Sequence, residues 1–333
     1  MRTIILISLI LITFAVSSCS KEDPDRSGYL TATTVAADLT IDSLMPWVER
    51  FTLAHLNDTP VDNTGFPPAD LFPSDHLTRD AAVGMFSTVL ESMGYEPDTA
   101  VLSDDVNTTY NVFAEWPGTT KAGEVILVAG HIDAFYGGSD DNTTAIAAIL
   151  EAARAVRKHS FARTIRFVAF DLEELGSIGS TRYLEQGLAD DVKAAIVLDL
   201  VGYASEEPGS QKNIKGIRFP DVGNYLMVCG NKDSESLTRQ ITDMSHSCGL
   251  TKTVGILAPG DGTYFLSSVF MRSDHGLMWY KGIPTVFFTD GANFRNPNYH
   301  LPSDLPSTVN KDFLVNNTRL LTAAIALMAE VQK

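Results

Sequence analysis

The chain has 333 residues, of which 41 are acidic and 25 are basic, so its formal net charge is -16 at pH 7. Such an excess of carboxylates argues against binding to nucleic acid or to an anionic membrane surface through a basic patch. Hydrophobic residues make up 44% of the sequence and no Gly- or Ser-rich linker divides it, so the chain is long enough to bury one large core.

The N-terminus carries a short apolar segment. Residues 3–16 follow Arg2 and are too few to span a bilayer, which predicts a signal peptide over residues 1–18 and export of the protein. Ser17 and Ser18, directly before Cys19, resemble a bacterial lipobox. Cys19 is therefore the predicted site of lipidation, and ordinary signal cleavage near the same place is the alternative.

The segment after Cys19 is polar. Ser-Lys-Glu-Asp at 20–23 resembles the acidic sorting signal that sends some bacterial lipoproteins to the outer cell surface. We therefore expect a lipoprotein of the outer membrane or cell surface, attached to the membrane only through its lipid, with a periplasmic or secreted protein as the alternative. The Ser-, Thr- and Asp-rich composition predicts a flexible tether over residues 19–38.

Residues 39–333 are predicted to form a single domain. Leu44–Leu56 and Leu77–Met93 have the periodicity of amphipathic helices. Beyond them, strand-like runs alternate with helical patterns, which predicts a three-layer α/β/α sandwich. The predicted strands cover residues 111–116, 124–130, 164–170, 194–198, 225–229 and 285–288. The stretches 204–221 and 255–268 read as loops that could form a rim around a site.

Acidic and imidazole side chains follow several of these runs. His131 and Asp133 close the strand-like run 124–130, where they are either a metal ligand with its orienting carboxylate or a structural hydrogen-bonded pair. Asp141 precedes the helical pattern at 143–158, where an acidic residue taken alone is more commonly an N-cap than a ligand.

The adjacent acids Glu173 and Glu174 are a more specific signal. They follow the buried strand pattern 164–170 at the point where a helix is predicted to begin. One carboxylate of such a pair can bind a metal while its neighbour accepts a proton from water. The alternative is a solvated acidic turn at the start of a helix.

Two further candidates complete the set. Asp199 follows the strand-like run 194–198, although a lone Asp in such a place is commonly a turn residue. His300 lies in a loop rich in Asn and Pro, and Asp304 in the same loop could orient its imidazole. Since ligands gather at the carboxyl ends of strands in open α/β sheets, the arrangement favours one common site.

Together these segments resemble the co-catalytic zinc aminopeptidases of metallopeptidase family 28. The resemblance runs from about Leu77 to the C-terminus, and it departs from the family pattern only at positions such as Ala145 and Leu301, which are not candidate ligands. It implies a central mixed, mostly parallel sheet of the zinc-exopeptidase type. The segments that carry it are His-Ile-Asp at 131–133, Gly-Gly-Ser-Asp-Asp-Asn at 137–142, Phe-Asp-Leu-Glu-Glu-Leu-Gly-Ser at 170–177, Leu-Asp at 198–199 and Tyr-His-Leu-Pro-Ser-Asp at 299–304.

The resemblance also implies a role for each residue of the set. Asp141 would bridge two Zn²⁺ ions, and Glu173 would be the general base. The other implied ligands are Glu174 and His300 for one ion, and Asp199 and His131 for the second. Zinc suits a mixed imidazole and carboxylate set, and other divalent transition metals such as manganese or cobalt also fit it.

The implied function is that of an exported metallo-aminopeptidase that acts on peptides with a free N-terminus, using water activated by two zinc ions. A glutaminyl cyclase of the same fold is one alternative, although such cyclases typically carry a longer, Trp-containing insertion after the paired acids, whereas Glu174 is followed directly by Leu-Gly-Ser-Ile-Gly-Ser-Thr. A surface binding protein that keeps the metal site without catalysis is another. The sequence has no Gly-x-Ser-x-Gly elbow, P-loop or dinucleotide fingerprint.

Three further residues have candidate roles outside the ligand set. His275, in Ser-Asp-His-Gly at 273–276, is a candidate for substrate binding but not for the ligand set. Cys229 and Cys248 flank a helical pattern and either form a disulfide or remain two thiols. No pattern in the sequence defines an oligomeric state.

Overall fold

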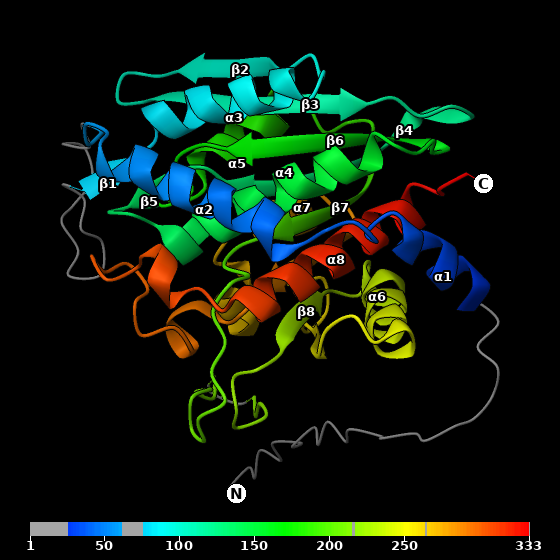
Figure 1. Ribbon diagram of the computed structural model, residues 1–333. Coiled ribbons are helices and arrows are strands. Elements are labelled where there is room, and N and C mark those ends of the chain that lie inside the picture. The colour runs from blue at the N-terminus through cyan, green and yellow to red at the C-terminus, as the bar shows by residue number, and fades with distance from the viewer. Residues whose placement is uncertain (1–25, 62–75, 215–216, 264, 333) are drawn as a thin grey trace, which may run out of the picture.

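An eight-stranded mixed sheet forms the centre of the computed structural model, which describes residues 26–61, 76–214, 217–263 and 265–332. The strand order is β2-β3-β6-β4-β7-β10-β8-β9 (Figure 1). The four central strands are parallel, and antiparallel neighbours adjoin them on both sides. The strands are β2 (Asp98–Ser103), β3 (Thr108–Trp116), β4 (Lys121–His131), β6 (Arg163–Phe170), β7 (Val192–Leu198), β8 (Leu226–Gly230), β9 (Thr253–Leu257) and β10 (Thr285–Thr289).

Helices cover both faces of this sheet. Figure 1 views the face on which α2, α3, α4, α6 and α8 lie. On the opposite face, α5 and α7 pack against the same strands. The α-helices are α1 (Arg26–Thr34), α2 (Ile41–Leu56), α3 (Asp80–Ser92), α4 (Ala145–Val156), α5 (Ile178–Glu185), α6 (Glu235–Cys248), α7 (His275–Tyr280) and α8 (Lys311–Met328). Shorter helical turns are η2 (Ser139–Thr144), η3 (Phe265–Met271), η4 (Ala292–Phe294) and η5 (Pro306–Thr308).

Side-chain alternation along the strands explains why both faces are buried. On β4, Ile126 and Val128 belong to the core under α4 and α8, whereas Leu127 and Ala129 belong to the core under α5 and α7. Successive side chains of a strand point to opposite faces, so a strand buried on both sides is a continuous apolar run. The structure confirms the predicted three-layer α/β/α sandwich with a mixed, mostly parallel sheet.

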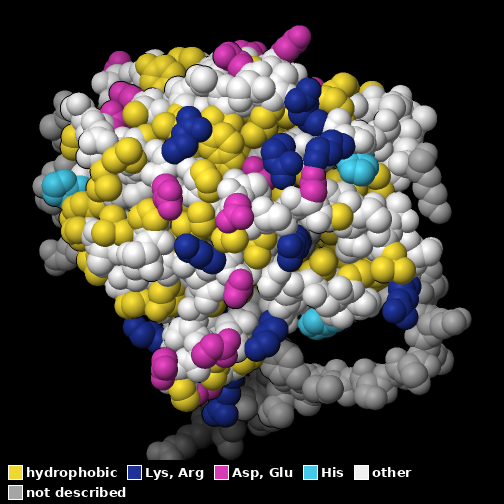
Figure 2. Space-filling model, in the orientation of Figure 1, with side chains coloured by type: hydrophobic (Ala, Val, Ile, Leu, Met, Phe, Trp, Pro, Cys, Tyr) yellow, Lys and Arg dark blue, Asp and Glu magenta, His cyan; other side chains and the backbone are white. Residues whose placement is uncertain are grey.

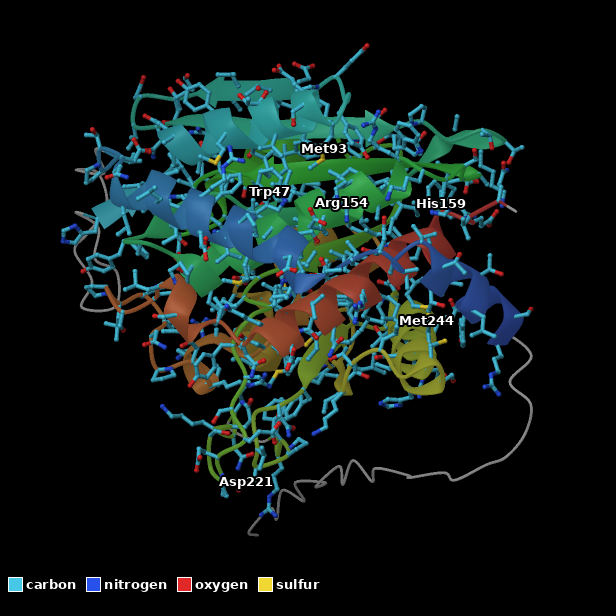
Figure 3. The ribbon with its side chains drawn as sticks, in the orientation of Figure 1. Trp47, Met93, Arg154, His159, Asp221 and Met244 are labelled. Carbon is cyan, nitrogen blue, oxygen red and sulfur yellow. The ribbon has the colours of Figure 1, made fainter. Side chains whose placement is uncertain are left out.

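A buried carboxylate ties two helices of the viewed face together. Glu151 of α4 is 1% exposed, and one of its oxygens accepts a hydrogen bond of 2.9 Å from the indole Nε1 of Trp47 on α2. Its other oxygen accepts from Nε of Arg154, also at 2.9 Å. Figure 3 labels Trp47 and Arg154 where α2 passes α4. Both oxygens of a buried charge are thus satisfied, as its burial requires.

Charged side chains of both signs are interspersed on the face seen in Figure 2. The acidic excess of the sequence is therefore not gathered on that face. Ten acidic residues in the described part of the chain are buried, against four arginines. Much of the negative charge accordingly lies inside the protein, where it needs compensation by cations or hydrogen bonds.

All six predicted strands are present, and two edge strands were missed. β2 has a single buried residue, Ala100, so it lacks the apolar alternation that identifies a strand. β9 includes Gly255, which suggested a loop over 255–268; the prediction is wrong for Gly255–Leu257, because this segment pairs in parallel with β8. A small antiparallel sheet pairs β1 (Leu77–Thr78) with β5 (Ala134–Phe135). The first residues of the predicted helix Leu77–Met93 therefore form a strand.

The tether predicted over residues 19–38 is wrong from residue 26 onward. Residues 26–34 form α1, which contacts α8 and α6. Ala32 and Leu39 are fully buried, and Tyr29 and Val35 are nearly so. The polar residues that suggested a tether lie on the exposed side of this segment, since an amphipathic helix needs only one apolar face. Residues 1–25, with the predicted signal peptide and Cys19, lie outside the described residues.

Cys229 and Cys248 are both thiols, so the disulfide alternative is wrong. On β8, Cys229 shares a sheet face with Tyr225 and Met227, away from α6. Cys248 ends α6 and packs against the core on the other face. Burial raises the pKa of the Cys229 thiol to about 12.

Among the residues that the structure describes, no helix is both long enough and apolar enough to cross a bilayer.

The packing of α1 predicts a stability effect that a tether would not show. Ala32→Glu places a charge in a fully buried position, so we expect the free energy of unfolding to fall by about 2 to 4 kcal/mol in urea denaturation. The control is Leu30→Glu on the same helix, where the side chain is 52% exposed and we expect a change below about 0.5 kcal/mol. Equal stabilities of the two variants would contradict the docking of α1.

Candidate metal centre

The five candidate ligands meet at the carboxyl ends of the central parallel strands. His131 is the last residue of β4, Glu174 follows β6, and Asp199 follows β7. Asp141 lies in η2, between β5 and α4, and His300 lies in the loop between β10 and α8. These five residues were the ones singled out in the sequence, and the structure brings all of them together.

Asp141 stands at the middle of the cluster. Its Oδ1 lies 3.3 Å from Nε2 of His131, and its Oδ2 lies 3.1 Å from Nε2 of His300. The same nitrogen of His131 is 3.3 Å from Oδ1 of Asp199, and that of His300 is 3.0 Å from Oε2 of Glu174. The residues thus form two three-membered groups that share Asp141, and the donor atoms of each group lie within 4.8 Å of one another.

Burial makes this concentration of charge costly. Burial raises the pKa of Glu174 to about 7 and that of Glu173 well above its usual value. Burial also opposes charge on His131, yet hydrogen bonds with Asp133, Asp141 and Asp199 raise its pKa well above the usual value. The carboxylates therefore require positive charge close by.

The donor set fits divalent cations. Imidazole nitrogen and carboxylate oxygen are ligands of zinc and related metals, and a carboxylate shared between two groups can bridge two ions. Oε1 of Glu174 is buried and accepts no hydrogen bond from any described residue. A buried carboxylate oxygen without a donor is unusual, and a cation at this position would satisfy it.

Asp133 holds the two glutamates in place. Its two carboxylate oxygens accept hydrogen bonds from the backbone N–H of Glu173, at 3.0 Å, and of Glu174, at 3.1 Å. Nδ1 of His131 lies 3.0 Å from the backbone carbonyl of Asp133, so its N–H can donate there and leave Nε2 facing the other ligands. The predicted orientation of His131 by Asp133 thus runs mainly through the backbone, while the carboxylate positions the glutamates.

Asp304 positions the backbone of Asp141, the ligand that both groups share. The sequence led us to expect that Asp304 orients His300. In the structure its carboxylate accepts hydrogen bonds from the backbone N–H of Asp140, at 3.0 and 3.2 Å, and of Asp141, at 3.1 Å. Asp304 therefore fixes the backbone of the residue that both groups share.

Asn142 is a positioning residue that the sequence reasoning missed. Its side-chain amide donates to the carbonyl of Leu198 at 3.1 Å and accepts from the backbone N–H of Leu200 at 3.0 Å. These two residues flank Asp199, so η2 and the end of β7 are fastened to each other. The peptide bond between Asp141 and Asn142 is cis. The Asp-Asp-Asn run was visible, but its contact with β7 was not.

Three residues other than glycine adopt left-handed backbone angles close to the ligands. Leu172 has φ 51°, Leu200 has φ 54°, and His300 itself has φ 57°. Leu172 immediately precedes Glu173, and Leu200 immediately follows Asp199. Such strained conformations persist where the surrounding contacts fix them, and they gather at functional sites.

A cavity of about 70 Å³ opens beside the cluster, with Asp199 in its wall. His275, predicted to contact substrate, lines this cavity, and burial lowers its pKa to about 3. Ile214 and Phe219 of the rim predicted at 204–221 line this cavity, as does Phe294.

Known proteins are similar to this chain in sequence. The model of the peptidase family M28 matches residues 111–325. The uncharacterized protein YfbL of Escherichia coli is 28% identical over 209 residues, which are 56% of this chain and 62% of that protein. Aminopeptidase YwaD of Bacillus subtilis is 27% identical over 217 residues, covering 63% of this chain and 42% of that protein. The chain thus spans less than two-thirds of these relatives.

Solved structures share the fold at low sequence identity. The Legionella pneumophila LapA aminopeptidase superimposes with a TM-score of 0.66 at 18% identity, over 94% of this chain and 78% of that one. BSAP, a zinc aminopeptidase from Bacillus subtilis, gives 0.53 at 23% identity, over 69% and 52%. The glutaminyl cyclase of Porphyromonas gingivalis gives 0.61 at 15% identity, over 86% and 97%.

The hydrogen bonds of Asp304 predict an effect on metal affinity. Asp304→Asn keeps one acceptor oxygen but turns an N–H₂ toward the backbone N–H groups of Asp140 and Asp141. We expect about 10- to 100-fold weaker binding of a divalent ion, measured by competition with a chromophoric chelator. Asp312→Asn, at an exposed position of α8, is the matched control and should bind as the unaltered protein does. Equal affinities of the two variants would remove Asp304 from this role.

Proposed function

Because the chain belongs to peptidase family M28, whose model matches residues 111–325, we propose that it is a metallo-aminopeptidase that removes N-terminal residues from peptides. The observation that carries the proposal is the pair of ligand groups sharing Asp141, with Glu173 beside them and a cavity at their edge. Aminopeptidase activity is named for YwaD, one of the matched relatives.

The residues that would hold two Zn²⁺ ions are those already grouped by the fold. His131 and Asp199 would serve one ion, Glu174 and His300 the other, and Asp141 both. Zinc fits their mixed imidazole and carboxylate donors, and BSAP, which shares the fold, is named a zinc aminopeptidase. When bound, such ions polarise a carbonyl and make a water molecule more acidic.

Glu173 is proposed as the general base. Its backbone is fixed by Asp133, and its side chain, 8% exposed, accepts a hydrogen bond of 3.4 Å from the hydroxyl of Ser177. In the reaction, water attacks the carbonyl carbon of the N-terminal residue while Glu173 takes the proton of the water. The C–N bond then breaks, and Glu173 returns the proton to the departing amine nitrogen.

We propose that a carboxylate of the centre also binds the free α-amine, which only the terminal residue of a peptide offers. A free α-ammonium group is attracted to buried carboxylates, whereas an internal peptide bond brings no such charge. Peptides with a free N-terminus are therefore the proposed substrates.

A glutaminyl cyclase is the second candidate, because the superposition on this chain includes 97% of the Porphyromonas gingivalis cyclase. In this chain Glu174 leads within a few residues into α5, without the longer insertion expected of cyclases. A metal-dependent binding protein without catalysis is the remaining alternative, and it gives no reason for a base at Glu173.

Export and lipidation belong to the same proposal. We propose that residues 1–18 are removed and that Cys19 is acylated, which would place the enzyme in the outer membrane or at the cell surface. Labelled palmitate should be incorporated into the protein and lost in Cys19→Ser. Incorporation into that variant would refute the assignment.

The three candidate functions predict different products. The protein is incubated with aminoacyl-anilides and with a peptide that begins with Gln, after chelator treatment and after return of zinc. We expect release of aniline that the chelator abolishes and zinc restores. Formation of pyroglutamate would favour the cyclase, and binding of metal without any product would favour the binding protein.

Replacing Glu173 tests the base separately from the metal ligands. Glu173→Gln should lower kcat by about 10²- to 10⁴-fold, because the amide cannot accept the proton from water. Metal content, measured by atomic emission, should stay unchanged. Glu91→Gln, at an exposed position of α3, is the control. Nearly normal turnover in Glu173→Gln would assign the base elsewhere.

A further inference from the structure

The cavity beside Asp199 has a mainly apolar wall that is interrupted by a few polar groups. Its apolar lining includes Ile214, Phe219, Met227, Ile256, Phe287 and Phe294. Asp199 belongs both to this wall and to the metal centre. A residue whose α-amine and carbonyl lie at the centre can therefore extend its side chain into the cavity.

Two polar atoms on this wall have no hydrogen-bond partner among the described residues. Oγ of Ser273 and Nδ1 of His275 are both buried in this way. The two side chains are 3% and 1% exposed, respectively. By contrast, the hydroxyl of Thr289 on the same wall accepts a hydrogen bond of 3.1 Å from the backbone N–H of Gly291. The buried unpaired atoms on this wall thus lie in the segment 273–275.

The surroundings of His275 fix which nitrogen carries its proton. Nε2 lies 2.5 Å from the backbone carbonyl of Phe270, and a carbonyl can only accept. The imidazole is stacked on Phe287, with ring centroids 3.7 Å apart, and burial lowers its pKa to about 3. The ring is therefore neutral near pH 7, with the proton on Nε2 and a free lone pair on Nδ1.

Native proteins leave few buried polar groups unpaired, because a group removed from water without a partner is unfavourable. Two such groups on one cavity wall are explained if a ligand pairs with them. Ser273 offers a hydroxyl that donates and accepts, and His275 offers an acceptor. Two charged residues also line the cavity: Asp199 belongs to the metal centre, and Arg272 is exposed and donates a hydrogen bond of 3.0 Å to Asn293. A fully charged ligand end is disfavoured by the apolar residues around Ser273 and His275.

We propose that this cavity selects N-terminal residues whose side chains end in an uncharged polar group, above all the amides of Asn and Gln. The amide N–H₂ would donate to Nδ1 of His275, and the amide carbonyl would accept from the hydroxyl of Ser273. This assignment rests on the proposed aminopeptidase function and specifies its substrates.

Near-isosteric pairs of substrates test the preference. Anilides of Asn and Leu, of Gln and Met, and of Thr and Val differ mainly in the polar end of the side chain. We expect kcat/KM to be at least tenfold higher for the polar member of the Asn and Gln pairs, because the apolar member leaves the two wall groups unpaired. A ratio at or below one would overturn the proposal and leave a simple apolar pocket.

Variants of the wall connect the preference to its residues. Ser273→Ala and His275→Phe should each bring the ratio of kcat/KM for the polar substrate to that for the apolar substrate down toward one. His275→Phe keeps an aromatic ring against Phe287. If His275→Phe does not fold, Ser273→Ala provides the test. The control is Ser103→Ala, at an exposed position of β2, which should leave the ratio unchanged. An unchanged ratio in a folded Ser273→Ala variant would refute the role of that hydroxyl.

A binding measurement separates this proposal from the proposed reaction. Asparaginamide and leucinamide are titrated into the zinc-loaded protein by calorimetry, which requires no turnover. We expect asparaginamide to bind at least tenfold more tightly, and this difference to disappear in Ser273→Ala. If no anilide is hydrolysed, the aminopeptidase function fails while the binding ratio still decides the selectivity of the cavity. Equal binding of the two amides would refute the selectivity.

Discussion

The mutual repulsion of carboxylates in a buried centre is the constraint on which the rest of the structure depends. Asp141, Glu173, Glu174 and Asp199 converge in a region from which most water is excluded, and two histidines stand between them. Such a group is stable only if cations or hydrogen bonds offset the charge. The fold accordingly directs backbone N–H groups at Asp133 and Asp304, whose own carboxylates form the layer behind the ligands.

The same constraint explains how the elements of the sheet are joined near the site. Four parallel strands deliver their carboxyl ends to one edge, and each loop that leaves this edge is tied to a neighbour. Asn142 fastens η2 to the end of β7, and Asp304 fastens the loop after His300 to η2. Left-handed residues such as Leu172 and Leu200 let the chain turn sharply beside the ligands. Rigidity at these points keeps donor atoms converged in spite of their repulsion.

Fold and chemistry have to be weighed separately in this family. Aminopeptidases and a glutaminyl cyclase share the sandwich, so the sheet alone does not decide between hydrolysis and cyclisation. In the proposed function the local surroundings of the centre decide between the two reactions, because the short passage from Glu174 to α5 and the cavity beside Asp199 would shape what a bound peptide meets. In the proposed function the carboxylates that bind metal also attract the α-amine, so one set of charges serves catalysis and selection of the chain end.

The sequence by itself determined the sandwich, because buried strands are continuous apolar runs, and it showed that His131, the Glu173-Glu174 pair and Asp199 follow such runs. The place of Asp141 and His300 in the ligand set was implied by the resemblance to the family and not by local periodicity. The sequence did not reveal β2 or β9, since an edge strand buries few side chains, and it gave a tether where α1 packs through one narrow apolar face. Only the tertiary structure showed that Asp304 holds Asp141 and that Asn142 holds β7. It alone also placed Ser273 and His275 unpaired on one cavity wall. These contacts join segments far apart in the chain, and local periodicity carries no information about which distant backbone groups a side chain will meet.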